Sequence, residues 1–159
     1  KSIPGLKFAD DEEFILVQAI EKFCDPPINF QLERMAITNE RDILIFTIPE
    51  SNEKPHFVKL SSTEPPKAYV RVQDRSVQAS KEVKQILRRE NEEGIRFVFG
   101  EKEKVLMEYL AQHQNITLEK FAEIAKIPLW LASRTLVLLV LGHVLRVQPN
   151  ELVDTYVIY

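Results

Sequence analysis

The sequence predicts an α+β fold: a small mixed or antiparallel sheet with flanking helices, followed by a winged helix-turn-helix. Two observations predict it. In the first half, short stretches with strand character lie between two stretches with helical spacing. In the second half, three helical stretches precede two short strands, which is the order of a winged helix-turn-helix. The character changes near residues 92–100. We therefore expect two domains, 1–94 and 95–159.

The first predicted helix covers about 10–24. Asp10 is placed as its N-cap, with Glu13 as the capping-box partner. Apolar residues recur at helical spacing and include Phe14, Val17, Ile20 and Cys24. The helix ends at Asp25-Pro26-Pro27, because proline cannot continue it.

Four strands are predicted next. Residues 28–37 alternate apolar and polar side chains, which indicates a half-buried strand. Residues 43–48 form a continuous apolar run, which favours a central strand covered on both sides. Two shorter strands are expected at 56–60 and 68–72.

The remaining elements are helices and a hairpin. Ser80 is a suitable N-cap for a helix at 81–91, with Gly94 just past its end. Further helices are predicted at 101–114, at 118–127 after the N-cap Thr117, and at 129–143 after Pro128. The stretches 144–147 and 154–159 then predict a β-hairpin.

Composition narrows the class of protein. The net charge of −3 and the pI of about 5.7 argue against a generally basic nucleic-acid binder. Cys24 is the sole cysteine, so no intramolecular disulfide can form, and we expect a cytoplasmic protein. The most apolar run, 131–145, is interrupted by polar residues and too short for a bilayer, so no membrane contact is expected.

Patterns typical of enzymes are lacking. The three histidines show no metal-ligand spacing, and the four glycines form no phosphate-binding loop. Cys24 falls on an apolar helix face, which favours a structural thiol. The acidic run at 10–13 suits the positive end of a helix better than a metal. We therefore expect no catalytic residue, no metal and no cofactor.

Positive charge is concentrated at 67–89, where seven basic residues accompany two acidic ones, a balance of 7 − 2 = +5. Strand alternation places Tyr69 and Arg71 on one face, an arrangement suited to phosphate contact and base stacking. The alternative is a solvated face whose arginines, Arg71 and Arg75, pair with Asp74. The sequence leaves both open.

The last predicted helix raises the same choice. Trp130, Ser133 and Arg134 near its start could contact DNA, but residues 136–141 are wholly apolar. A helix that is apolar on every side must be covered on every side. The cover is either a second copy, giving a homodimer through this helix, or the first domain. Both nucleic-acid binding and protein interaction therefore remain open for this half.

The stretches ILIFTIPESNEKPHFVKL (43–60) and AYVRVQDRSVQAS (68–80), with CDPPI (24–28), resemble the Schlafen-type Alba-like domain over about residues 8–90. The resemblance implies a nucleic-acid-associated role, with Arg71 the most transferable position, followed by Arg75 and Ser76. Bacterial relatives often carry a C-terminal winged helix. They are described as DNA-binding transcriptional regulators, or as ATP-binding or RecG-helicase-related proteins.

The sequence also departs from that family. The Glu-Phe-Lys type motif and the Asn-x-x-Gly-Gly strand that open the domain are not found, so its first part is either lacking or diverged. Nuclease activity is not carried over, because its acidic residues lie mainly there. ATP binding has no glycine-rich loop to support it.

The resulting hypothesis is a cytoplasmic, bacterial, non-enzymatic transcriptional regulator that binds DNA, with RNA as the other candidate nucleic acid, and forms a homodimer. The expected contacts are Lys67, Arg71, Arg75, Lys81, Trp130, Ser133 and Arg134. The alternative is a protein-interaction module without nucleic-acid binding. A weaker alternative is an ATP-binding, helicase-related protein.

Overall fold

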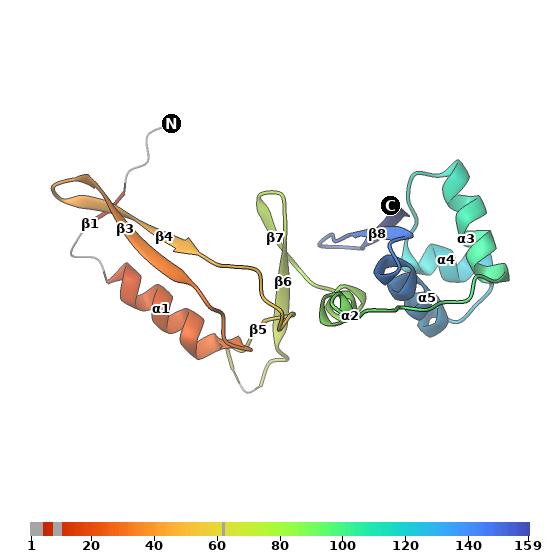
Figure 1. Ribbon diagram of the computed structural model, residues 1–159, viewed down its shortest axis with the longest axis horizontal. Helices are drawn as coiled ribbons and strands as arrows, with labels where there is room; N and C mark the ends of the chain where they lie inside the picture. Colours follow the sequence, from red (N-terminus) through yellow and green to blue (C-terminus); the bar gives the residue numbers. More distant parts are fainter. Residues whose placement is uncertain (1–4, 8–10, 62) are drawn as a thin grey trace. The chain divides into compact units, whose positions relative to one another are not determined.

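The computed structural model describes residues 5–7, 11–61 and 63–159, and it divides into two compact units, 1–67 and 68–159 (Figure 1). The fold is α+β with antiparallel strand pairs, as predicted. The helices are α1 (Glu12–Phe23), α2 (Lys81–Arg89), α3 (Glu101–Gln112), α4 (Leu118–Ala125) and α5 (Leu129–Leu141). The strands are β1 (Leu6–Lys7), β2 (Cys24–Asp25), β3 (Gln31–Thr38), β4 (Arg41–Thr47), β5 (Phe57–Val58), β6 (Lys67–Val72), β7 (Arg75–Gln78), β8 (Leu145–Gln148) and β9 (Thr155–Ile158).

In the first unit, the predicted strands at 28–37 and 43–48 correspond to β3 and β4, which form an antiparallel hairpin, and β1 pairs with the other edge of β4. The predicted central strand is therefore the middle strand, but most of its side chains are only half-buried. Asp42 on β4 is buried and pairs with Arg34 at 3.0 Å. Arg34 also reaches Glu13 of α1 at 2.6 Å, so one guanidinium links the helix to the hairpin.

The start of α1 differs from the expectation in one respect. The helix begins at Glu12 with Asp11 in the N-cap position, and no side-chain cap is formed there. The predicted cap, Asp10, lies outside the described residues. The apolar stripe of α1 is also less covered than helical spacing predicts, since Phe14 is 61% exposed and no residue of α1 is fully buried.

The second unit opens with the β6–β7 hairpin, of which the sequence predicted only the first strand. The strand at 68–72 is confirmed in β6, with Ala68 buried and Tyr69 half exposed, as alternation requires. Its partner β7 was not predicted. The two strands are joined by the turn Gln73-Asp74, with Gln73 in the left-handed region at φ 56°. This pair lacks the Asn-Gly or Asp-Gly signature of two-residue hairpins.

The core of the second unit forms where α3, α4, α5 and the β8–β9 hairpin meet. Its largest fully buried side chains include Leu106, Phe121, Leu136 and Tyr156. The predicted cap of α4 is confirmed, because Thr117 Oγ1 accepts a hydrogen bond from Lys120 N at 3.2 Å. The axes of α4 and α5 differ by 113° across a three-residue connection in which Lys126 is left-handed.

Helix α2 packs against α5 within this unit. Ser80 Oγ caps α2 as predicted, accepting from Val83 N at 3.1 Å, and Val83 and Ile86 are buried. Helix α5 is also packed by α4 and β8. Apart from its first turn, the apolar residues of α5 are therefore buried or half-buried inside the unit. A homodimer through α5 stays a prediction, and no exposed apolar stripe on this helix supports it.

The division of the chain differs from the predicted boundary at 94/95, because α2 lies in the same compact unit as α3–α5. The assignment of domains at 1–94 and 95–159 stays a prediction. Among the described residues, no single helix is long and apolar enough to cross a membrane; α4 and α5 together reach that length and composition, with the 113° bend between them.

Candidate functional site

A groove runs between α2 and the start of α5. Its volume is about 460 Å³. The residues that line it, called the basic groove below, are Lys81, Gln85, Arg88, Arg89, Trp130, Ser133 and Arg134. Four of the seven are cations and none is a carboxylate.

Helix α2 places its residues in the groove by spacing. Lys81, Gln85 and Arg88 are four and three positions apart, so they share one face of the helix. Arg89 follows directly and also pairs with Glu92 at 2.9 Å. The opposite face carries the buried Val83 and Ile86. The basic face of α2 is thus the side left to solvent once its apolar side is packed.

Helix α5 supplies the other wall. Trp130 is 64% exposed and Arg134 is also exposed. Ser133, by contrast, is buried, and its Oγ donates a hydrogen bond to Glu82 of α2 at 2.6 Å. This bond fixes α2 against α5.

The charge of the groove is largely uncompensated. In the described part of the chain, Lys81, Arg88 and Arg134 form no ion pair. Guanidinium groups form strong, geometrically defined hydrogen bonds with phosphate and carboxylate oxygens. The groove is therefore suited to an anion with several negative groups.

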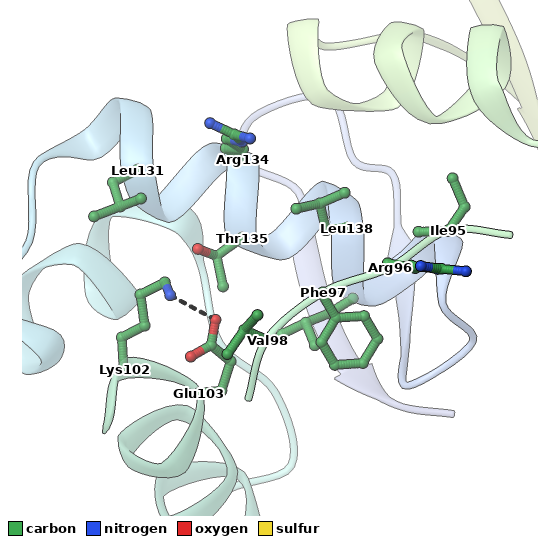
Figure 2. Close-up of a pocket in the computed structure, with 11 residues that line it drawn as sticks. Ile95, Arg96, Phe97, Val98, Lys102, Glu103, Leu131, Arg134, Thr135 and Leu138 are labelled. Carbon is green, nitrogen blue, oxygen red and sulfur yellow. Dashed lines mark ion pairs between the residues drawn. The ribbon is translucent and has the colours of Figure 1, made fainter. Parts of the chain in front are cut away.

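Arg134 also borders a second, apolar hollow of about 730 Å³ on the far side of α5 (Figure 2). Figure 2 shows Thr135 directed toward the Lys102–Glu103 ion pair, and Arg134 on the opposite side of the helix. Burial opposes the ionisation of Glu103. The Lys102 ammonium at 2.8 Å and the Gly100 N–H nevertheless hold the pKa of that carboxyl below its usual range. The apolar lining comes mainly from Ile95, Phe97, Val98, Leu131, Leu138 and Leu139.

The candidates on the strand are not in the groove. Arg71 donates to Gln73 O at 3.2 Å and to Ser76 Oγ at 3.3 Å, so its guanidinium braces the β6–β7 turn. Arg75 is exposed, and Asp74 forms no ion pair with either arginine in the described chain. Lys67 pairs with Glu64 at 3.3 Å.

The structure thus brings together Lys81, Trp130, Ser133 and Arg134, which the sequence had placed in two domains. Arg88, Arg89 and Gln85 were missed as site residues. The indication was present in the sequence, because Lys81, Gln85 and Arg88 lie on one helical face. The position of α5 beside that face was not readable from it.

The described residues give no evidence for a metal site or for a reactive thiol. No group of three or more His, Cys, Asp or Glu side chains able to hold a metal occurs among the described residues. Cys24 is half-buried at the end of α1, and burial raises the pKa of its thiol. A raised pKa disfavours the reactive thiolate, in keeping with a structural role.

These features define an α+β protein with a basic, tryptophan-bearing groove in its second unit. The chain belongs to the Schlafen, AlbA_2 family, whose model matches residues 1–80, half of the chain. This confirms the resemblance to the Schlafen-type Alba-like domain. The family suggests a nucleic-acid-related role. No curated protein and no solved structure matches the chain.

Proposed function

We propose that this chain is a non-enzymatic nucleic-acid-binding regulator that contacts phosphates through the basic groove. The observation that carries the proposal is the convergence of four cations from α2 and α5, with no carboxylate among the lining residues. Phosphate contacts from lysine and arginine supply most of the sequence-independent affinity of such proteins. Membership of the AlbA_2 family supports the same class of partner.

The part of the second unit at 95–159 is proposed to be a winged helix-turn-helix. There, α3, α4 and α5 precede the β8–β9 hairpin, and the 113° bend and short turn between α4 and α5 fit the 90–120° crossing of that motif. Transcriptional regulation is the role we expect of such a unit. DNA is the first partner to test. RNA offers the same phosphates and is the second.

Binding is tested by fluorescence anisotropy with a labelled oligonucleotide over a series of salt concentrations. If four cations each neutralise one phosphate, log K should fall against log salt with a slope of about −3 to −4. Replacing Arg88 or Arg134 by alanine should weaken binding and reduce the steepness by about 1 each. Lys104→Ala, an exposed lysine on α3 outside the groove, is the matched control.

An unchanged slope in both arginine variants would contradict a site in the basic groove. The hairpin cations are tested separately with an Arg71→Ala/Arg75→Ala protein. Wild-type affinity in that protein would remove the β6–β7 hairpin from the contact surface. Lys67→Ala tests the remaining candidate in the same way.

A second function, protein interaction, is favoured by one observation. The first unit exposes several large apolar side chains, among them Phe14, Ile15, Leu16, Met35 and Ile37. Contiguous apolar surface on a folded protein commonly marks an interaction site. Light scattering after size-exclusion chromatography, run beside the anisotropy titration, separates the two functions. A stable oligomer with no affinity for nucleic acid at low salt would support the interaction module.

A further inference from the structure

We propose that the basic groove takes single-stranded nucleic acid, with the Trp130 indole stacked on one unpaired base. This inference rests on the proposed function and narrows it to one class of partner. Three features of the second unit carry it: the cover that α2 places on α5, the exposed indole, and the cations beside that indole.

The cover on α5 stands in the way of the usual duplex contact. In helix-turn-helix proteins the second helix of the motif lies in the major groove, which is about 12 Å wide. Here α2 packs against that helix and is joined to it by the Ser133–Glu82 hydrogen bond. Two packed helices, each about 10 Å across, are roughly 20 Å wide. The pair is too wide to enter the groove together.

The side chains near the start of α5 also argue against the reading of a DNA duplex. Reading base edges needs exposed donors and acceptors near the start of the helix. Ser133 and Thr135 are the hydroxyl side chains there, and they are only 7% and 4% exposed. Arg134 alone remains as an exposed polar side chain in that part of α5. The helix therefore has too few groups to read a duplex sequence directly.

Trp130 fits an unpaired base instead. Its side chain is 64% exposed although tryptophan is a residue that proteins usually cover. Proteins that bind single strands combine a positive groove along the backbone with aromatic rings on which bases stack. Trp130 lines the same groove as Lys81, Arg88 and Arg134. The indole offers a stacking surface, and the three cations offer phosphate contacts around it.

The proposal implies little dependence on sequence. Stacking tolerates every base, because each base has a π-face. Gln85 is the one amide among the lining residues, and the proposal assigns the arginines to phosphates, so we expect few base-specific hydrogen bonds. We expect the groove to discriminate between paired and unpaired strands rather than between sequences.

The chain carries its own reporter of this contact, since Trp130 is its sole tryptophan. The experiment titrates the full chain with an unlabelled single strand of about 12 nucleotides, and with the duplex of the same sequence, at low salt. Tryptophan emission is recorded in parallel with anisotropy of a labelled copy. We expect the single strand to bind about tenfold more tightly or better, and to quench the emission, while the duplex does not quench it.

Variants assign the effect to the ring. Trp130→Ala should lower single-strand affinity about 5- to 150-fold, the range that loss of one stacked base produces. Trp130→Phe should retain most of the affinity, because it keeps an aromatic face. Leu129→Ala is the matched control: Leu129 is the neighbouring exposed apolar residue, at 53%, and does not line the groove. Circular dichroism melts of the variants verify that folding is unchanged.

The outcomes separate the two proposals. Equal or tighter binding of the duplex without quenching would overturn the single-strand inference and leave nucleic-acid binding in place. Full single-strand affinity in Trp130→Ala would also overturn it. Absence of binding to either strand form at low salt would remove the proposed function itself, and the exposed indole would then point to a protein partner.

Discussion

At the scale of single residues, two predicted contacts have structural roles. Ser133 Oγ donates a hydrogen bond to Glu82 at 2.6 Å, and Arg71 spans the β6–β7 turn through hydrogen bonds to Gln73 O and Ser76 Oγ. The serine is buried, so we do not expect it to meet a ligand. Its hydrogen bond to a carboxylate places the two walls of the groove, which makes it a positioning residue for Trp130 and Arg134.

Tyr156 gives a pH-dependent prediction at the same scale. Burial raises the pKa of this phenol above its usual value of 10.0, and the carboxylates of Glu82, Asp154 and Glu119 act in the same direction. Below pH 10 the phenol is neutral in both the folded and the unfolded chain. Above it only the unfolded chain ionises, so the free energy of unfolding should fall as pH rises.

The fall should amount to about 1.4 kcal/mol per pH unit once the pH is clear of 10. Tyr156→Phe should remove this contribution and leave the rest of the pH profile. Urea unfolding of both proteins at several alkaline pH values measures the difference. Parallel profiles for wild type and Tyr156→Phe would show that the buried phenol is not the source.

At the scale of elements, local chemistry was readable from the sequence and packing was not. Ser80 and Thr117 predicted the starts of α2 and α4, because a cap depends on residues three positions away. Strand β7 was missed, because Gln73-Asp74 is not a typical sequence for a two-residue hairpin turn. The basic groove was missed as a unit because it depends on which side of α2 meets α5, a contact between residues about fifty positions apart.

The cap of α2 can be tested directly. Ser80→Ala removes the acceptor for Val83 N, and we expect a loss of about 1 kcal/mol in the free energy of unfolding. Ser80→Asp should keep most of the stability, because aspartate also caps and suits the positive end of the helix. Urea unfolding of the three proteins compares them. Equal losses in both variants would mean that the Ser80 side chain acts through packing rather than through capping.

At the scale of the whole molecule, the two units differ in how they are held together. The buried hydrophobic core of the described residues lies entirely in 68–159. The first unit has antiparallel pairing and the Glu13–Arg34–Asp42 ion pairs, but among its described residues the apolar side chains other than Pro55 are at best half-buried. Because apolar burial is the main favourable term in folding, the second unit should be the more stable one.

Hydrogen exchange measured by mass spectrometry tests this difference. Amides in α1 and β3 should exchange well before those in α3 and α5, since units with little buried apolar surface open at lower free energy. The measurement is made at two protein concentrations. Protection of α1 that grows with concentration would show that a second copy covers its exposed Phe14, Ile15 and Leu16. Equal protection of the two units at both concentrations would contradict the expectation that their stabilities differ.

Added single-stranded DNA should slow exchange in α2 and the start of α5, where the basic groove lies, and leave β3 unchanged.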